Sequence, residues 1–366
     1  MKIIHFRLIH IDISISHTSA TIYISIINSS FICIFFCMFY ILTQSARAEG
    51  NFVESDLFGS LKEGEKAAVL VVHFGTTHED TRAKTIDAVN NKIAEAFPGI
   101  EVREAWTSRI IIHRMKTRGL KRLSPEEALR QLKTDGYTHI LIQSSNIIEG
   151  TEMESLRKDV AAQEKDFKEI RISTPLLFSP GDYEAVIAAI TPKGIKDGAV
   201  LLVGHGTYTP NTAQYAMLDY MLKAKGFSRW SVGTIEGYPS FDDALSQIKS
   251  GSQKTIQLIP FMFVAGEHAK NDIAGDWKEN LEKQGYRVDV LMEGLGQNPA
   301  IQDIIVQHAR FCATHKYLDI VKKKKEYANE FPIHSLKLRY ESDVNQYGQN
   351  YLYTSKDNVF LALKRE

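Results

Sequence analysis

Cysteine is scarce in this chain of 366 residues, which contains only Cys33, Cys37 and Cys312. No pair of them has the CxxC spacing of zinc sites, and no disulfide framework is possible if the first two are removed with an N-terminal signal. Net charge is absent as well, because 44 Lys and Arg balance 44 Asp and Glu. This balance argues against a nucleic-acid-binding protein that works through bulk charge. No phosphate-binding glycine loop of the P-loop kind occurs, so neither ATP nor an organic cofactor is implied.

A run of apolar residues near the N-terminus covers residues 31–42. Twelve residues are few for a membrane span but typical of the core of a secretory signal. Ala46-Arg47-Ala48 follows as a cleavage pattern, and cleavage after Ala48 leaves 366 − 48 = 318 residues. We therefore expect a signal peptide over residues 1–48 and no stable membrane span after its removal. An uncleaved N-terminal anchor is the alternative.

The rest of the chain alternates between strand and helix patterns, which predicts an α/β protein with parallel sheets and helices on both faces. Strands are expected at residues 67–74, 100–105, 139–143 and 170–173, and in the second half at 199–203, 231–235, 255–264 and 287–292. Helices are expected at 79–97, from a serine cap and proline at 124–125, at 151–167 and near 211–224. We divide the chain into a linker (49–65), two α/β domains (66–195 and 196–315) and a polar tail (316–366).

An internal repeat relates the two domains. The segment 128–133 resembles 244–249, and each is followed by a strand and, 22 residues after its first alanine, by Gly150 or Gly266 (150 − 128 and 266 − 244). Gly75-Thr76 likewise follows the first strand as Gly206-Thr207 follows its counterpart. The repeat predicts two similar lobes that face each other across a cleft.

Three side chains are candidates for a metal site in that cleft. His205 stands between Gly204 and Gly206 at the end of a buried strand, where open α/β sheets bind ligands. Glu152 and His268 occupy matching places in the repeat, two residues after its glycines. Two imidazoles and one carboxylate are a suitable ligand set for Co²⁺, Fe²⁺ or Zn²⁺. Phe74 takes the place of His205 in the first half, which would leave one face of the site open to a substrate.

Each candidate also has a plainer interpretation. His205 would then be part of an ordinary turn, Glu152 an acid in the first turn of a helix, and His268 a residue at a helix start. Asp272 and Asp276 continue from His268 at intervals of four, which places all three on one face of a helix. That row is either a carboxylate path for metal or a solvated face. Weaker candidates are His73, His78 and His113, and the cations Arg109, Arg114 and Lys116, which either pair with substrate carboxylates or are surface charge.

Several long motifs resemble one known family, the anaerobic sirohydrochlorin cobaltochelatases, which are class II chelatases related in fold to ferrochelatase. They are VVHFGTTHEDT (71–81), TSRIIIHRM (107–115), GHGTYTPNTAQYAMLDYM (204–221), EGYPS (236–240), PFMFVAGEHAKNDIAGD (260–276) and GLGQNPAI (294–301). The resemblance spans residues 66–314 and implies two flavodoxin-like domains with a tetrapyrrole in the cleft between them. It also implies a metal held by His205, His268 and Glu152, and a periplasmic location for members with signal peptides. Some periplasmic members bind haem through a histidine in the segment where this chain has Asn146, so haem binding is in doubt.

We therefore expect the chain to insert Co²⁺ into sirohydrochlorin, or a close analogue, with release of two protons. His205 and His268 would act as ligands and proton acceptors, and Glu152 would supply negative charge. Phe74, Gly204, Gly206, Arg109 and Arg114 are expected near the substrate. Chelation of Fe²⁺ or Ni²⁺, a non-catalytic periplasmic carrier of tetrapyrrole or metal, and a two-lobed binding protein are the alternatives. The sequence leaves homo-oligomerisation open.

Overall fold

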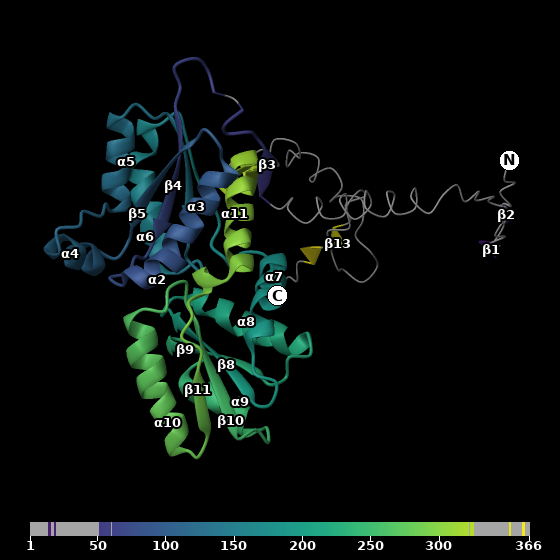
Figure 1. Ribbon diagram of the computed structural model, residues 1–366. Helices are drawn as coiled ribbons and strands as arrows, with labels where there is room; N and C mark the ends of the chain where they lie inside the picture. The colour runs from purple at the N-terminus through teal and green to yellow at the C-terminus, as the bar shows by residue number, and fades with distance from the viewer. Residues whose placement is uncertain are drawn as a thin grey trace, which may run out of the picture. The chain divides into compact units, whose positions relative to one another are not determined.

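The computed structural model describes residues 51–59, 61–321 and 323–325, together with β1 (Ser14–Ile15), β2 (Thr18–Ser19), β13 (Tyr351–Leu352) and β14 (Leu361–Ala362). The signal peptide predicted over residues 1–48, with its cleavage pattern, lies outside the described residues except for β1 and β2, and so does most of the predicted tail. The chain divides into two compact units, residues 54–316 and residues 1–53 with 317–366. In the latter, β1 pairs antiparallel with β2, and β13 with β14. The fold of residues 54–316 is described below (Figure 1).

Two four-stranded parallel sheets form the framework of this unit. The first sheet has the order β5-β4-β6-β7, with β4 (Ala67–His73), β5 (Glu101–Trp106), β6 (His139–Ser144) and β7 (Glu169–Ile172). The second, written from the same edge, has the order β9-β8-β10-β11, with β8 (Ala199–Gly206), β9 (Trp230–Glu236), β10 (Thr255–Phe261) and β11 (Arg287–Val290). The strand order is therefore the same in both halves. The predicted α/β class with two similar parallel-sheet halves is confirmed.

The remaining elements connect these strands. The α-helices are α2 (Glu79–Lys84), α3 (Ile86–Ala96), α4 (Arg109–Thr117), α5 (Pro125–Thr134), α6 (Thr151–Gln163), α7 (Pro180–Ile190), α8 (Ala213–Ala224), α9 (Phe241–Lys249), α10 (Lys278–Lys283) and α11 (Pro299–Thr314). Short 3₁₀ turns are η1 (Glu164–Asp166), η2 (Thr191–Lys193), η3 (Pro210–Thr212) and η5 (Leu295–Gln297), η4 (Ala269–Trp277) is a π-helix, and β3 (Phe52–Glu54) and β12 (His315–Tyr317) are short strands.

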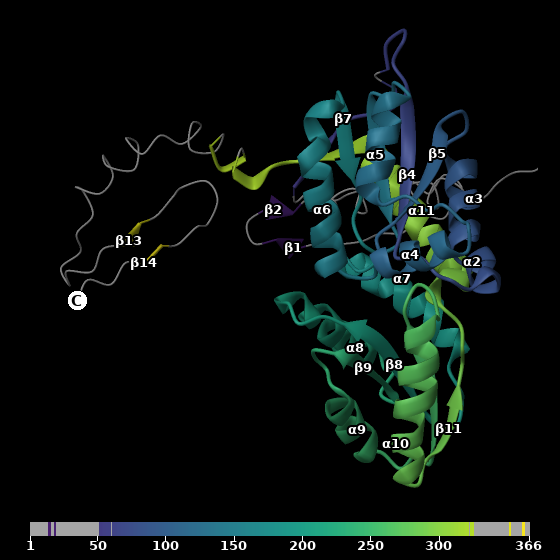
Figure 2. The ribbon, with the colours of Figure 1, turned by 90° about the vertical axis from the view of Figure 1, so that its left-hand side faces the viewer.

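Both faces of the first sheet are covered, which explains why β4 is an uninterrupted apolar run. Leu70 packs in the cluster formed with α5 and α6, whereas Val69 and Val71 belong to the cluster on the other face, which contains α3 and α11. All three strand residues are completely buried. Helices α5 and α6 lie side by side over their face of the sheet (Figure 2).

Helix starts follow the repeat closely. Ser124 and Glu127 form a capping box at the start of α5, and Ser240 and Asp243 form one at the start of α9. The two caps are 116 residues apart, as are Gly150 and Gly266 (240 − 124 and 266 − 150). A serine cap satisfies backbone N–H groups that the first helical turn leaves unpaired.

Three local expectations differ from the structure. The single helix expected at 79–97 is broken at Thr85, whose hydroxyl donates to the Thr81 carbonyl and whose side chain lies against Gly296. Helix α7 was not expected, although Ser179 and the proline after it are a typical helix start. In the predicted linker, Leu57 is completely buried in the core, so this segment is packed rather than free.

Helix α11 crosses back to the first half of the unit. It belongs to the second predicted domain by sequence, but it packs against β6, α3 and α7. Its C-terminal carbonyls, at Cys312 and Ala313, accept hydrogen bonds from the buried guanidinium of Arg171 on β7. The same guanidinium also bonds to Ser55, so one buried cation ties three segments together.

Candidate active site

Strand β8 ends in a turn that requires both of its glycines. Gly206 has φ +85°, and a Cβ there would lie 1.6 Å from the carbonyl oxygen of Glu236. A Cβ on Gly204 would lie 2.3 Å from the ring of Tyr215. Gly206 is needed for its backbone conformation, whereas Gly204 is needed because a side chain there would collide with Tyr215. Between them, His205 is held half-buried at the carboxyl end of the sheet.

Tyr215 supports this turn from α8. Its side chain is buried, its ring packs edge-on against Phe261, and its hydroxyl accepts a 3.4 Å hydrogen bond from the Gly206 N–H. Burial raises the pKa of Tyr215 to about 12, so the phenol stays neutral. The turn that carries His205 is thereby anchored to the core of the second half.

His268 stands at the start of the π-helix η4, beyond the end of β10. Its Nδ1 lies 2.7 Å from Oδ2 of Asp272, one turn along the helix. Such a carboxylate partner fixes the ring orientation and, in the neutral imidazole, the Nδ1–H tautomer. The lone pair of Nε2 is then available to a metal ion. Helix η4 itself is fixed by Ile273 and Trp277, which are buried against the second sheet.

The two imidazoles come together. The ring centroids of His205 and His268 are 4.8 Å apart, with the rings perpendicular. Strands β8 and β10 are neighbours in the second sheet, which is why residues 63 positions apart meet at one edge (268 − 205). The sequence predicts that His205, His268 and Glu152 converge on one metal ion, and the structure brings the first two of these side chains together.

The third expected ligand, Glu152, does not complete a three-residue metal site with this pair in the structure. Among the described residues no group of three His, Cys, Asp or Glu side chains is arranged to hold a metal ion. Glu152 is half-buried in the first turn of α6. The start of that helix is tied to the second half, because the Glu149 N–H donates to Gln214 and the Glu149 carbonyl accepts from Asn211. Its role as ligand remains a prediction.

Glu236 is a second carboxylate at the same edge, and it was not among the candidates expected from the sequence. It is the last residue of β9 and the register partner of Gly206, directly beside the His205 turn. Its side chain is half-buried. The motif that contains it was recognised, but only the pairing of β9 with β8 shows that it adjoins His205.

The weaker histidine candidates have different surroundings. His78 Nε2 lies 2.9 Å from Glu267, the neighbour of His268, and this hydrogen bond lowers the pKa of the Glu267 carboxyl. His113 is exposed on α4. His73 is buried, and it contacts Ser145 and Asn90 at 2.9 Å each.

Both ring nitrogens of the buried His73 have hydrogen-bond partners, so this histidine belongs to the core. Its ring stacks on Phe263, which follows β10 and precedes the His268 loop, at a centroid distance of 5.6 Å. Burial lowers the pKa of His73, although the hydrogen bond to Asn90 and the charge of Glu104 act in the opposite direction. The neutral ring of His73 therefore joins the two halves through its contact with Phe263.

Exposed aromatic side chains follow the carboxyl ends of β4, β8 and β9. Phe74, at the position that corresponds to His205, is 44% exposed at the end of β4. Tyr208 follows the His205 turn and is 82% exposed, and Tyr238 follows Glu236. Aromatic side chains of this kind suit a flat, largely apolar ligand.

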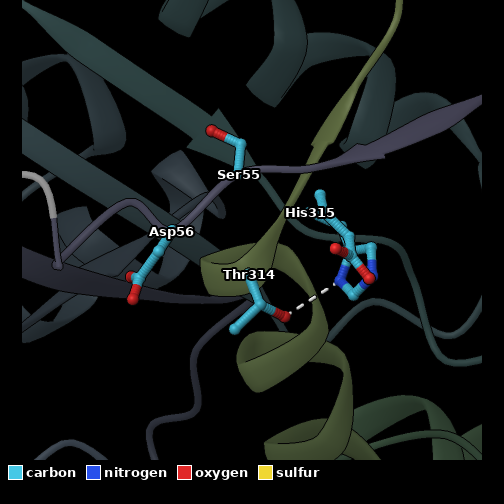
Figure 3. A pocket seen from close by; sticks show the side chains of 5 residues that line it. Ser55, Asp56, Thr314 and His315 are labelled. Atoms are coloured by element: carbon cyan, nitrogen blue, oxygen red, sulfur yellow. Dashed lines mark hydrogen bonds between the residues drawn. The ribbon is translucent and has the colours of Figure 1, made fainter.

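A pocket of about 380 Å³ occurs elsewhere, at the end of α11, and is lined by Glu54, Ser55, Asp56, Thr314 and His315 (Figure 3). Nδ1 of His315 is 2.9 Å from the Thr314 hydroxyl, and its ring stacks on Phe311 at 4.1 Å. In Figure 3 the Asp56 and His315 side chains lie on opposite sides of Thr314, so they do not form a ligand pair.

Within the described part of the chain, no helix has the length and apolar character needed to cross a membrane.

Comparisons of the sequence with known proteins identify one family. The model of the cobalt chelatase (CbiK) family matches residues 67–313. The chain is 35% identical to the sirohydrochlorin cobaltochelatase of Salmonella typhimurium over 251 residues, which cover 66% of this chain and 95% of the relative. It is 32% identical to the sirohydrochlorin cobaltochelatase CbiKC of Nitratidesulfovibrio vulgaris over 253 residues, covering 66% and 89%. Among solved structures, SirB from Bacillus subtilis with Fe³⁺ shares the fold, with a TM-score of 0.50, 14% identity and coverage of 68% and 96%.

Proposed function

Because the chain belongs to the cobalt chelatase (CbiK) family, as the match over residues 67–313 shows, we propose that it inserts Co²⁺ into sirohydrochlorin. The reaction exchanges two pyrrole N–H protons for one divalent cation, so the macrocycle leaves with the metal and two protons are released. The observation that carries the proposal is the pairing of His205 and His268 at one sheet edge, with ring centroids 4.8 Å apart.

The paired imidazoles supply the two kinds of chemistry that metal insertion needs. A neutral imidazole either donates its lone pair to the incoming cation or accepts a pyrrole proton near neutral pH. His268 is oriented by Asp272 so that Nε2 is the free nitrogen. His205 approaches from the turn on β8, and we assign both roles to the pair jointly.

Carboxylates near the pair offset the cost of removing water from the cation. Glu152 and Glu236 are the two candidates, on α6 and at the end of β9. We propose that one of them completes the metal site when the ion and the macrocycle are present. Phe74, Tyr208 and Tyr238 offer the apolar surface on which the macrocycle would lie.

The decisive experiment mixes purified protein with excess sirohydrochlorin and Co²⁺ and follows the absorbance of the macrocycle. Turnover beyond one equivalent supports an enzyme, whereas a plateau at one equivalent would mean a carrier. Fe²⁺ and Ni²⁺ run in parallel identify the preferred metal, because imidazole and carboxylate ligands accept all three.

The His205→Ala/His268→Ala double variant is expected to lose turnover by roughly 10²–10⁴-fold, the usual worth of a positioned acid–base group. His315→Ala is the matched control, since this histidine lies at the end of α11 with its Nδ1 bonded locally. Full activity in the double variant would exclude the mechanism.

We also propose that the mature protein is periplasmic and begins after Ala48. The support is the apolar run at 31–42 and the cleavage pattern that ends at residue 48. N-terminal sequencing of the protein from a periplasmic extract tests this. An intact N-terminus in a membrane fraction would instead indicate an anchor.

A further inference from the structure

The expected ligands of the metal belong to different halves of the unit. His205 and His268 follow neighbouring strands of the second sheet, so the pairing of β8 with β10 fixes them relative to each other. Glu152 lies on α6 in the first half, and the two sheets are separate. A site that uses all three side chains therefore depends on contacts that hold the start of α6 against the second half.

The carboxylate of Glu152 differs from its neighbours in having no basic partner. Glu149 pairs with Arg157, and Glu154 pairs with Lys158. In the part of the chain that the structure describes, no hydrogen bond or ion pair engages the carboxylate of Glu152, which is half-buried. A partly buried carboxylate without a counter-charge suits a bound cation.

Two side chains of the second half hold the loop that leads into α6. The Asn211 amide donates to the Glu149 carbonyl, and Gln214 Oε1 accepts a 2.9 Å hydrogen bond from the Glu149 N–H. The Gln214 amide nitrogen donates to the Leu177 carbonyl at 2.6 Å, so the donor and the acceptor of this amide are both used. We call Asn211 and Gln214 the clamp. It fixes the backbone three residues before Glu152.

A salt bridge connects the clamped loop to the body of α6. The Arg157 guanidinium, on α6, donates to both carboxylate oxygens of Glu149. A carboxylate held through two hydrogen bonds has a specific geometry relative to the guanidinium. Because Glu149 is bonded to the helix in this way, the loop, the helix and Glu152 should move together rather than independently.

The clamp adjoins the residue that supports the other side of the site. Tyr215 directly follows Gln214, is buried in the core, and accepts with its hydroxyl a hydrogen bond from the turn that carries His205. The two clamp residues are three positions apart, which places both on one side of a helical turn. One turn of the chain thus supports the His205 turn on one side and the Glu152 loop on the other.

We propose that the clamp residues, Asn211 and Gln214, position the Glu152 carboxylate so that it joins the paired histidines on Co²⁺. This inference rests on the proposed function, in which Glu152 is one of two candidate carboxylates of the metal site, and it selects Glu152. The clamp residues bond to backbone groups of the first half. Their effect on the metal should therefore pass through Glu152 and vanish when this residue has no carboxylate.

A double-mutant cycle tests this dependence. Calorimetric titration with Co²⁺ gives the dissociation constants of the wild type, of the clamp variant Asn211→Ala/Gln214→Met, of Glu152→Gln and of the combined variant. We expect the clamp variant to bind Co²⁺ about tenfold more weakly, the lower end of the range for residues that orient metal ligands. Glu152→Gln should weaken binding at least as strongly. In the Glu152→Gln background, the clamp substitutions should change the constant less than about twofold.

Gln163→Met is the matched control. The Gln163 amide donates to the Glu126 carbonyl at 3.2 Å, at the far end of α6 and within the first half. The control removes a hydrogen bond of the same kind from the same helix, but this bond does not connect the two halves. It should leave the dissociation constant for Co²⁺ unchanged. Circular dichroism verifies that each variant is folded.

Equal losses with and without the Glu152 carboxylate would overturn the inference, because the clamp would then have only a structural role. Wild-type affinity in the clamp variant would overturn it as well. So would wild-type affinity in Glu152→Gln, which would remove the residue through which the clamp acts. These outcomes are read from binding constants alone. A wild type that binds Co²⁺ but does not metallate sirohydrochlorin would instead refute the proposed function.

Discussion

From the hydrogen bond between His268 and Asp272 we predict how much metal affinity is lost when Asp272 is replaced. Replacement of Asp272 by alanine removes the partner that lies 2.7 Å from Nδ1. The ring would then rotate freely and share its proton between two nitrogens, so Nε2 would be aimed at the metal only part of the time. Removal of such a partner usually weakens metal binding 10- to 100-fold, which corresponds to about 1.4–2.7 kcal/mol.

Orientation, rather than charge, should account for most of this loss. The side chain of His268 is 53% exposed and that of Asp272 is 28% exposed, so water screens the attraction between their charges. Asp272→Asn keeps an oxygen that accepts from Nδ1–H, and it should retain most of the affinity. Asp276→Ala is the matched control, because it removes an exposed carboxylate from the same helix one turn further on.

Calorimetric titration of the metal-free protein with Co²⁺ measures these affinities directly. Wild-type affinity in Asp272→Ala would refute the positioning argument. An equal loss in the asparagine variant would show that the charge matters and the hydrogen bond does not. A slower uptake of Co²⁺ in Asp276→Ala, with unchanged affinity, would favour the carboxylate path over a solvated face.

Three further predictions concern the surroundings of the site. Gly206→Ala should abolish chelation, because the new Cβ would lie 1.6 Å from the Glu236 carbonyl oxygen. Gly136→Ala is the control, since Gly136 has a similar φ of +81° but no atom within 4 Å of the added Cβ. This control should lower the free energy of unfolding by only about 1–2 kcal/mol and leave turnover intact. Burial lowers the pKa of His73 in the folded protein. Below about pH 6.5 the unfolded chain binds a proton at this histidine and the folded chain does not, so the free energy of unfolding should fall as the pH drops. Urea unfolding at pH 7.5 and 5.5 should show a smaller fall for His73→Gln, and an identical fall would contradict the assignment. Burial raises the pKa of Cys312 to about 12, so a thiol reagent should label it only after denaturation, which mass spectrometry of the labelled peptide can check.

The repeat was the most informative feature of the sequence for the fold. The equal spacing from Ala128 to Gly150 and from Ala244 to Gly266 predicted two copies of the same helix–strand unit. Identical strand order in the two sheets is the structural counterpart of that spacing. Local signals were sufficient here because each unit uses the same caps and buried strands.

Features that depend on contacts between the halves could not be read from the sequence. Helix α11 looks like the last helix of the second half, and only its packing against β6 and α3 assigns it to the first. At the helix break, the Thr85 side chain lies against Gly296, which is more than 200 residues away in the sequence. Local propensity carries no information about either contact.

The same distinction between local signals and long-range contacts explains which site residues could be predicted. His205 and His268 were found because each follows a strand, and neighbouring parallel strands bring their carboxyl ends together. Glu236 was missed because the sequence does not show that β9 pairs with β8. Glu152 matches His268 in the repeat, but equivalence between lobes does not ensure contact across them.

The return of α11 to the first sheet also constrains how the protein is made. Ile301, Ile304 and Ile305 complete a hydrophobic core whose other members, such as Val69 and Leu141, leave the ribosome more than 150 residues earlier. Until α11 has been synthesised, the face of the first sheet that α3 also covers lacks part of its core. A fragment that ends before residue 299 therefore lacks the helix that completes the core of its own first half.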